Sequence, residues 1–346
     1  MNKPRVLVIE TGGTIAQKRG RDGIFRPTEK TITPMVRGIR KFADVQVERL
    51  PKLIDSTNML TDQRASLATM IYKRAHEFDG FVIVHGTDTM ADTAASLTFM
   101  LQGLGKPVVL TGSQISIYEE RTDGKSNLSA AIRTATQDYG EVLIAFGNGV
   151  FRGPRTVKDD EEGLNAFFSP RTPPVGKIGI TVEPCDNRIA RFNGETRLFT
   201  EFDTKIAFVY PMSGISIDTF SDQVKQENIH GFVFVGFGAG NIPETYYGGI
   251  EQATRLNKPI VVVTQCSKGA ADMGIYAVGA EPLKLGAISG GDMTMQTATQ
   301  KLMYALGKAA AEGISTSDII RFVKQIMHTD YAKEITVERL KAFMSR

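Results

Sequence analysis

The sequence predicts an α/β protein of two domains, of which the N-terminal one is built around a mostly parallel sheet with helices on both faces. Three observations lead to this prediction. The chain has 346 residues, more than one ordinary hydrophobic core accommodates. Short runs rich in Val, Ile and Leu alternate with longer helix-like stretches, as they do in parallel sheets. This alternation stops in a polar stretch near residue 185 and then starts again.

The first half contains four short apolar runs, each soon followed by Gly, Thr or Asn. They predict buried strands at Arg5–Ile9, Gly80–Val84, Pro107–Leu110 and Val142–Phe146. Between and after these strands, apolar residues recur at helical spacing. They predict helices at Asp62–Phe78, Ala91–Leu104 and Ser126–Thr136.

A polar segment at residues 188–204 is interpreted as the connection between an N-terminal domain, residues 1–187, and a C-terminal domain, residues 205–346. The second domain repeats the alternation. Strands are predicted at Lys205–Tyr210, Gly231–Val235 and Pro259–Thr264, and helices at Asp222–Asn228, Glu251–Asn257 and Gln296–Ala311.

Composition argues against several classes of function. The net charge is only +3 and the 41 Lys and Arg residues are spread along the chain, so we expect no nucleic-acid partner. Two cysteines and four scattered histidines show no metal-ligand spacing, so neither a metal nor another cofactor is expected. No apolar run approaches the ~20 residues that a membrane span needs. A cytoplasmic protein without a membrane partner is therefore expected.

The loop after the first strand, Thr11–Ala16, places two glycines between two threonines. Gly12 and Gly13 allow positive φ angles and the close approach of a ligand. The loop lacks the Gly-Lys-Ser/Thr ending of a phosphate-binding loop. An ordinary strand-to-helix turn remains the alternative, and the residues themselves do not distinguish Thr11 from Thr14.

The loop after the second predicted strand, His85–Met90, carries two threonines and a carboxylate. A Thr–Asp pair before a helix is often only a cap, and Asp88 is placed to cap a helix beginning near Ala91. The imidazole of His85 is a candidate general base. Because no Gly-x-Ser-x-Gly nucleophile motif is present, we interpret His85 as a structural, hydrogen-bonded histidine.

A threonine hydroxyl needs a base to act as a nucleophile at neutral pH. Lys158, which follows the fourth predicted strand in a turn-like segment, is a candidate. The neighbouring Arg152 and Arg155 would disfavour its charged form. A solvated surface lysine is the alternative interpretation.

Taken together, these motifs resemble the bacterial-type L-asparaginases. Thr-Gly-Gly-Thr-Ile-Ala near the N-terminus and His-Gly-Thr-Asp-Thr-Met some seventy residues later are similar to the two signatures of that family. The similarity covers nearly the whole chain and is strongest to the cytosolic, type I branch. Further matching segments are Asp55–Met59, Thr111–Gln114, Asp123–Leu128, Arg152–Lys158, Ala166–Pro170, Gly236–Asn241, Thr264–Cys266 and Gly290–Thr294.

The resemblance implies a larger N-terminal and a smaller C-terminal α/β domain, assembly into a homodimer or homotetramer, and hydrolysis of L-asparagine. Thr14 would attack the side-chain amide to give an acyl-enzyme, and Thr87, Asp88 and Lys158 would form a second triad. Ser56 and Thr57 would bind the substrate, Ser56 at its α-carboxylate, and Asp88 would bind its α-ammonium group. The remaining implied contacts come from the backbone of Gly13, Gly86 and Ser113 and from a second-domain loop carrying Asn241.

One segment departs from the family pattern. The family usually carries a tyrosine in the mobile loop after the first signature, whereas here Gln17–Pro27 has none. Ile24 or Phe25 occupies the corresponding position. With two glycines and four basic residues, this segment is predicted to be a mobile lid.

Two other functions remain as alternatives. The ammonia-releasing subunit of an archaeal Glu-tRNA(Gln) amidotransferase shares these motifs, although that subunit normally carries an extra domain before the first signature. A non-catalytic amino-acid-binding protein on the same fold would explain Phe25. The presence of Thr14, Thr87, Asp88 and Lys158 favours an enzyme, because a binder needs no such set.

Overall fold

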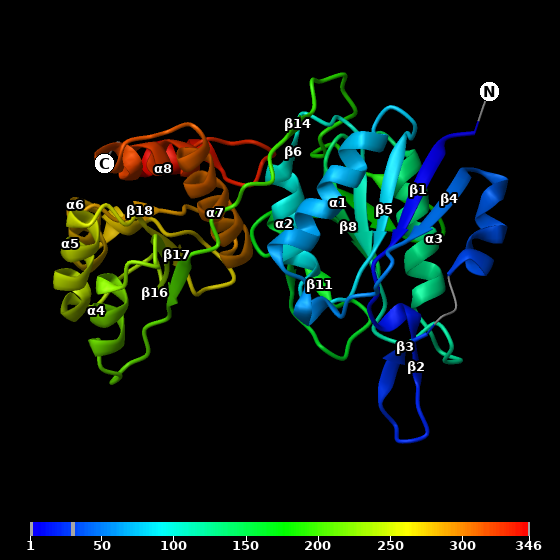
Figure 1. Ribbon diagram of the computed structural model, residues 1–346, viewed down its shortest axis with the longest axis horizontal. Coiled ribbons are helices and arrows are strands. Elements are labelled where there is room, and N and C mark those ends of the chain that lie inside the picture. Colours follow the sequence, from blue (N-terminus) through cyan, green and yellow to red (C-terminus); the bar gives the residue numbers. More distant parts are fainter. Residues whose placement is uncertain (1–2, 29–31, 345–346) are drawn as a thin grey trace. The chain divides into compact units, whose positions relative to one another are not determined.

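The computed structural model describes residues 3–28 and 32–344 and divides into two compact units, Met1–Thr200 and Glu201–Arg346 (Figure 1). Each unit is an α/β structure with a largely or wholly parallel sheet, as the sequence predicts. The division falls within the stretch proposed as the interdomain connection.

The first unit is built on an eight-stranded sheet in the order β13-β12-β9-β8-β7-β5-β1-β4. Its five strands from β4 to β8 are parallel, and β9, β12 and β13 extend one edge in antiparallel fashion. The bounds are β1 Arg5–Glu10, β4 Asp44–Arg49, β5 Gly80–Val84, β7 Val108–Thr111, β8 Val142–Phe146, β9 Gly149–Arg152, β12 Gly176–Ile178 and β13 Val182–Pro184.

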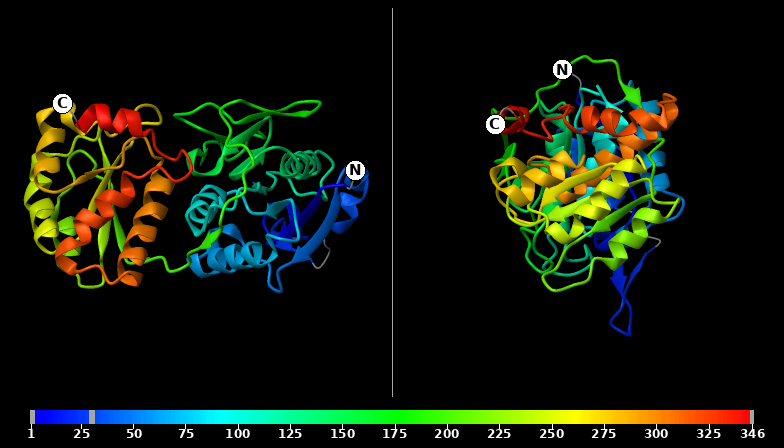
Figure 2. Two further views of the ribbon diagram at one scale, coloured as in Figure 1. Left: turned by 90° about the horizontal axis from the view of Figure 1, so that it is seen from above. Right: turned by 90° about the vertical axis from the view of Figure 1, so that its left-hand side faces the viewer.

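Helices cover both faces of this sheet (Figures 1 and 2). Residues of α3 pack with Val8, Val82 and Val109 on one face, and α2 contacts β7 and β8 from the other. The helices are α1 Thr61–Arg74, α2 Met90–Met100 and α3 Gly124–Thr136, with 3₁₀ turns η1 Thr14–Ala16, η2 Thr33–Lys41, η3 Ser56–Asn58 and η4 Gly153–Arg155. The central strands are apolar on both faces because both faces are covered.

Three short strand pairs complete the first unit. They are β2 Gln17–Arg19 with β3 Phe25–Pro27, β6 Leu101–Gln102 with β14 Arg197–Leu198, and β10 Val157–Lys158 with β11 Phe167–Phe168. The second pair explains a difference from the prediction. The helix expected to reach Leu104 ends at Met100 because the next two residues pair with β14.

Residues just after 187 bond to the first unit. The Arg188 guanidinium donates to the Asp138 carboxylate at 2.8 Å, and Arg191 donates to the carbonyls of Gln137 and Ala135. Together with strand β14, these bonds attach much of the polar segment 188–204 to the N-terminal unit.

The second unit has a four-stranded parallel sheet in the order β15-β16-β17-β18. Phe220 of α4 and Ile250 of α5 pack on Phe232 and Phe234 of β16, and α7 contacts β16 and β17. The strands are β15 Ile206–Val209, β16 Gly231–Gly236, β17 Ile260–Thr264 and β18 Ile288–Ser289. The helices are α4 Asp218–Lys225, α5 Tyr247–Arg255, α6 Ala277–Lys284, α7 Met295–Ala311, α8 Ile319–Met327 and α9 Val337–Met344, with 3₁₀ turns η5 Glu244–Tyr246, η6 Met273–Ile275 and η7 Thr316–Asp318.

A fully buried ion pair links α7 to the segment after α8. The Lys301 ammonium lies 2.5 Å from the Glu334 carboxylate and also donates to the carbonyls of Met327 and Thr329. Burial alone would raise the pKa of Glu334, but the adjacent Lys301 charge lowers it below its ordinary value.

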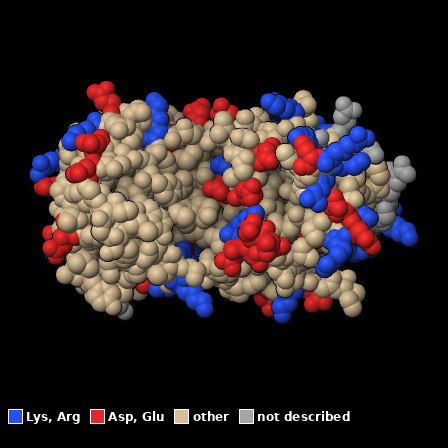
Figure 3. Space-filling model, turned by 90° about the horizontal axis from the view of Figure 1, so that it is seen from below, with Lys and Arg blue, Asp and Glu red and all other residues tan. Residues whose placement is uncertain are grey.

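Within the described ranges, none of the helices combines the length and the apolar character needed to cross a membrane. Among the described residues on the face drawn in Figure 3, acidic and basic side chains are interspersed. This distribution agrees with the even charge pattern of the sequence.

Candidate active site

Loops that follow the parallel strands β1 and β5 meet through glycines. Gly12 and Gly13 have φ angles of +132° and +87°, in the region that side chains rarely adopt. A Cβ atom on Gly13 would lie 2.5 Å from the Cα atom of Gly86. Only glycine therefore allows the two signature loops to pack backbone against backbone.

The segment after β4 joins the same contact. A Cβ atom on Gly86 would lie 2.7 Å from the Cβ atom of Ser56, and one on Gly12 would collide with the Ile54 carbonyl. Three of the predicted site residues are thus in contact one after the other, because Gly13 packs on Gly86 and Gly86 packs on Ser56. They lie beyond the carboxyl ends of parallel strands, where α/β sheets bind ligands.

The loop after β7 packs against this group. A Cβ atom on Gly112 would collide with the His85 carbonyl, and Ser113 beside it is buried. The loop is held by Asp123, whose carboxylate accepts from the backbone N–H groups of Gln114 and Ile115. The sequence carries no local signal for this role, because a carboxylate before a helix predicts a cap, and Asp123 makes no capping bond to α3.

The structure distinguishes the two threonines of the first signature. The Thr11 hydroxyl is buried and donates to the Val84 carbonyl at 2.9 Å. Thr14 is only half-buried, begins the turn η1, and its hydroxyl has no protein hydrogen-bond partner among the described residues. Of the two, Thr14 alone offers an uncommitted hydroxyl beside the Gly13–Gly86 contact.

Lys158, Thr87 and Asp88 form a hydrogen-bonded group. The Lys158 Nζ atom lies 3.0 Å from the Thr87 Oγ1 atom and 2.8 Å from the Asp88 Oδ1 atom. Lys158 reaches them from strand β10, whose pairing with Phe167 fixes its backbone. The Lys158 side chain is 20% exposed and that of Asp88 is 53% exposed, so this group is accessible from solvent.

Asp88 does not cap helix α2, and that interpretation was wrong. The helix begins at Met90, its N-cap position is Thr89, and no side chain caps it. The Asp88 carboxylate instead accepts from Lys158, 70 residues away in the chain, because the strands bring the two loops together.

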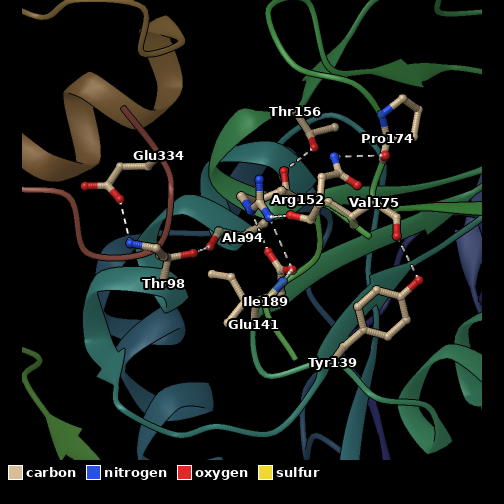
Figure 4. A network of polar contacts seen from close by, with 12 residues as sticks. Ala94, Thr98, Tyr139, Glu141, Arg152, Thr156, Pro174, Val175, Ile189 and Glu334 are labelled. Carbon is tan, nitrogen blue, oxygen red and sulfur yellow. Dashed lines mark hydrogen bonds and ion pairs between the residues drawn. The ribbon is translucent and has the colours of Figure 1, made fainter. Parts of the chain in front are cut away.

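Arg152 has its own counterion. Its guanidinium lies 2.6 Å from the buried Glu141 carboxylate, and its carbonyl accepts from the Thr156 hydroxyl (Figure 4). Glu141 also accepts from the Ile189 N–H group. Because Glu141 balances its charge, Arg152 does not act on Lys158 as an unpaired positive charge. It anchors the segment that precedes Lys158.

His85 has the structural role expected of it. Its Nδ1 atom lies 2.7 Å from the Gly86 carbonyl, which can only accept, so Nδ1 carries the proton. Its Nε2 atom lies 3.0 Å from the Thr93 hydroxyl. Burial lowers the pKa of His85 to about 4, and the imidazole is therefore neutral at pH 7.

The turn η3, which carries Ser56 and Thr57, is capped by its own sequence. The Asp55 carboxylate accepts from the backbone N–H and the hydroxyl of Thr57, at 3.1 and 2.9 Å. Ser56 is buried, whereas Thr57 is exposed. The capping bonds therefore occupy Thr57 and leave Ser56 facing Gly86.

The predicted lid is a β-hairpin. Strands β2 and β3 pair in antiparallel register, and Arg26 forms a two-bond ion pair with Asp22 near the tip. Ile24 and Phe25 are exposed, and Arg19 lies over the Phe25 ring. The hairpin base is tied down by the Ser116 hydroxyl, which donates to the Gln17 carbonyl.

The last predicted residue, Asn241, belongs to the second unit. It lies in the turn after β16, where its backbone N–H donates to the Phe237 carbonyl at 2.7 Å. Its Oδ1 atom is buried and accepts no hydrogen bond from the described residues.

The first unit thus presents a free hydroxyl on a glycine turn that packs against the loop carrying a second hydroxyl and a carboxylate, both bonded to a lysine. A hydroxyl near a lysine can be deprotonated to act as a nucleophile. Carboxylate and serine groups nearby can bind a small zwitterion. This combination is suited to acyl transfer on a small amino-acid amide.

Comparisons with known proteins agree with this chemistry. Residues 5–189 match the family model described as asparaginase, N-terminal, and residues 205–314 match the glutaminase/asparaginase C-terminal domain. L-asparaginase 1 of Escherichia coli is 34% identical over 320 residues, which cover 89% of this chain and 93% of that protein.

Two further relatives are informative. The crystal structure of L-asparaginase I from Vibrio cholerae has a TM-score of 0.86 and 30% identity, covering 97% of this chain and all of that one. One subunit of the glutamyl-tRNA(Gln) amidotransferase of Pyrococcus horikoshii is 33% identical, over 96% of this chain and 77% of its own length. Because both domain models match in order and cover most of the sequence, this chain belongs to the asparaginase family.

Proposed function

We propose that this protein hydrolyses L-asparagine to L-aspartate and ammonia through a threonine-bound acyl-enzyme. The observation that carries the proposal is the hydrogen-bonded group of Lys158, Thr87 and Asp88 beside a glycine turn that presents Thr14. Relatives named L-asparaginase that align along nearly their whole length support the choice of substrate.

In the first half-reaction, the Thr14 hydroxyl attacks the side-chain carbonyl carbon. The C–O bond forms, the C–N bond breaks, and the Thr14 proton is passed on so that ammonia leaves. Backbone N–H groups of Gly13, Gly86 and Thr87 are the proposed donors to the oxyanion. The backbone of Ser113 is the proposed contact of the leaving amide.

In the second half-reaction, water attacks the ester and releases aspartate and the free hydroxyl. Lys158 would accept the proton, through Thr87, in one of these steps. Its 3.0 Å contact with the Thr87 hydroxyl supports that role. Without such a base, a threonine hydroxyl or a water molecule is a weak nucleophile at neutral pH.

The α-groups of the substrate supply its orientation. Ser56 would bind the α-carboxylate and Asp88 the α-ammonium, while Thr57 supports the turn on which Ser56 lies. Only one Asp88 oxygen accepts from Lys158, and the side chain is half exposed, so a substrate cation can approach it. With both ends fixed, one added methylene costs ~1–3 kcal/mol, and asparagine should be preferred to glutamine.

An ammonia-releasing subunit of an amidotransferase is the second candidate, because such a subunit aligns over 96% of this chain. Such a subunit releases ammonia that a partner enzyme then uses, whereas an asparaginase releases it as a final product. Assembly into a homodimer or homotetramer remains a prediction, which sedimentation of the purified protein tests. A cytoplasmic location is also a prediction.

A coupled assay of ammonia release separates the candidates. The purified chain is tested with L-asparagine, L-glutamine and no substrate. We expect turnover of asparagine with a kcat/KM about tenfold or more above that for glutamine. Equal specificity constants would refute the assigned substrate, and release only after a partner is added would favour the amidotransferase role. No release under either condition would favour a binding protein.

A further inference from the structure

Thr89 occupies the N-cap position of helix α2, but its hydroxyl does not cap that helix. A threonine at this position normally accepts from the first turn of the helix. Here the Thr89 Oγ1 atom donates instead to the Ser56 carbonyl at 2.7 Å, across 33 residues of sequence. The side chain thus connects the second signature loop to the turn that carries Ser56.

Contacts with Asp55, Gly86 and Thr89 all bear on the position of Ser56. Asp55 caps the turn, Gly86 forms the surface on which the Ser56 side chain rests, and Thr89 holds its carbonyl. The cap fixes the shape of the turn, and Gly86 limits it on one side only. The bond from Thr89 ties the turn directly to the second signature loop, whereas the Ile54 N–H group just before the turn donates to the Thr11 carbonyl of the first loop.

We propose that Thr89 is a positioning residue that aims the Ser56 hydroxyl at the carboxylate of the substrate. The inference rests on the proposed function, in which Ser56 binds that carboxylate. It adds that affinity for amino-acid ligands depends on a hydroxyl outside the group formed by Lys158, Thr87 and Asp88.

The consequence for kinetics differs from that of losing a reacting group. The substrate carboxylate does not react, so its contact is equally strong in the ground state and the transition state. Losing such a contact raises KM and leaves kcat nearly unchanged. The fold should tolerate the loss, because the Ser56 carbonyl keeps its bond from the Met59 N–H group at 3.0 Å.

The test compares Thr89→Val, which removes the donor, with Thr89→Ser, which keeps it. Thr69→Val is the matched control, because the Thr69 hydroxyl donates only to Ala65 on its own helix. We expect Thr89→Val to raise the KM for asparagine and the calorimetric Kd for L-aspartate about tenfold, as loss of one hydrogen bond implies. Its kcat should stay within about threefold, and Thr89→Ser should restore both constants.

The outcomes are separable. If the wild type is active and Thr89→Val leaves KM and Kd unchanged, the positioning role alone is contradicted. The same follows if Thr89→Ser raises KM and Kd as much as Thr89→Val does. A wild type that neither releases ammonia from asparagine nor binds aspartate overturns both proposals. If Thr89→Val fails to fold by circular dichroism, Thr89→Ala removes the same donor without the added methyl contact and decides the question.

Discussion

For single residues, the chemistry of the site depends on which hydroxyl groups are already bonded. Thr11 and Thr14 flank the same two glycines, yet the Thr11 hydroxyl is bonded to Val84 and the Thr14 hydroxyl is not bonded to the described protein. A committed, buried hydroxyl contributes stability, whereas an uncommitted one is available for chemistry.

Substituting each threonine in turn therefore separates stability from catalysis. Thr14→Ala should lower kcat for asparagine by at least about 10³-fold while leaving the urea midpoint unchanged, because only the nucleophile is removed. Thr11→Val should lower stability by about 1 kcal/mol and keep turnover. Activity within tenfold of wild type in Thr14→Ala would show that another group is the nucleophile.

Lys158 is either a base or a structural partner of Asp88, and two substitutions distinguish these roles. Lys158→Met should reduce kcat about 10²–10⁴-fold, the usual contribution of a positioned base. Lys158→Arg should not rescue it, since a guanidinium stays protonated. Substantial activity in Lys158→Arg, measured at equal substrate saturation, would instead identify Lys158 as an ion-pair partner.

His85 makes the stability of the first unit depend on pH. The folded protein keeps the imidazole neutral down to a pKa of about 4, whereas the unfolded chain binds a proton near pH 6.5. Between these values the unfolded state holds more protons, so stability falls as pH falls from 6.5 to 4. The loss from this residue is on the order of 3 kcal/mol.

Urea midpoints measured at several pH values from 7 to 4.5 test this linkage. His85→Asn should be less stable at pH 7 and should lose less stability on acidification than the wild type, because it lacks the titrating group. Parallel pH profiles for the two proteins would mean that other groups cause the acid sensitivity.

Among the secondary-structure elements, the segment expected to close the site is a hairpin rather than an irregular loop. Its tip is held by local bonds among Arg19, Asp22, Gly23 and Arg26, and its base by Ser116. A hairpin whose strands and tip are bonded to each other moves as one piece about its anchored base. Hinge closure of such an element is a common way to exclude water from an intermediate.

We therefore expect L-aspartate to slow amide hydrogen exchange across residues 17–27 at least several-fold, with little change in the buried strands. Asp22→Ala should weaken that protection, because it removes the partner of Arg26. Phe25→Tyr tests the departure from the family pattern. If kcat changes by less than twofold, the missing hydroxyl has no role here, and exchange that is insensitive to aspartate would contradict the lid.

For the molecule as a whole, stability resides in two separate units, each with its own core. The second unit places an ion pair in its interior, between Lys301 and Glu334. Removing one member of a fully buried pair leaves the other charged and uncompensated, at a cost of about 3–5 kcal/mol.

Glu334→Leu should accordingly lower the unfolding free energy of the second unit by several kcal/mol in a urea titration. Glu281→Gln breaks the exposed pair with Lys284 and should change it by less than about 1 kcal/mol. The double variant Lys301→Met with Glu334→Leu should recover much of the loss, since it leaves no buried charge. Equal effects of the single variants at positions 334 and 281 would contradict this account.

Local patterns in the sequence were sufficient to predict the class of fold, the main strands and helices and the position of the two signature loops. Apolar periodicity reports burial, and glycines beside polar residues mark strand ends, so both signals are local. The match of Gly80–Val84 and Val142–Phe146 to strands β5 and β8, residue for residue, follows from such local signals.

The neighbours of each polar side chain, in contrast, depend on how the chain folds in three dimensions. In the folded structure the Thr11 hydroxyl is bonded to Val84 and that of Thr14 stays free among the described residues. Asp88 pairs with Lys158 instead of a helix end, and Thr89 donates to Ser56. These partners lie 33 to 73 residues apart in the chain, and the order of strands in the sheet brings them together. A hydrogen bond depends on distance and direction in space, which no local pattern of residues encodes.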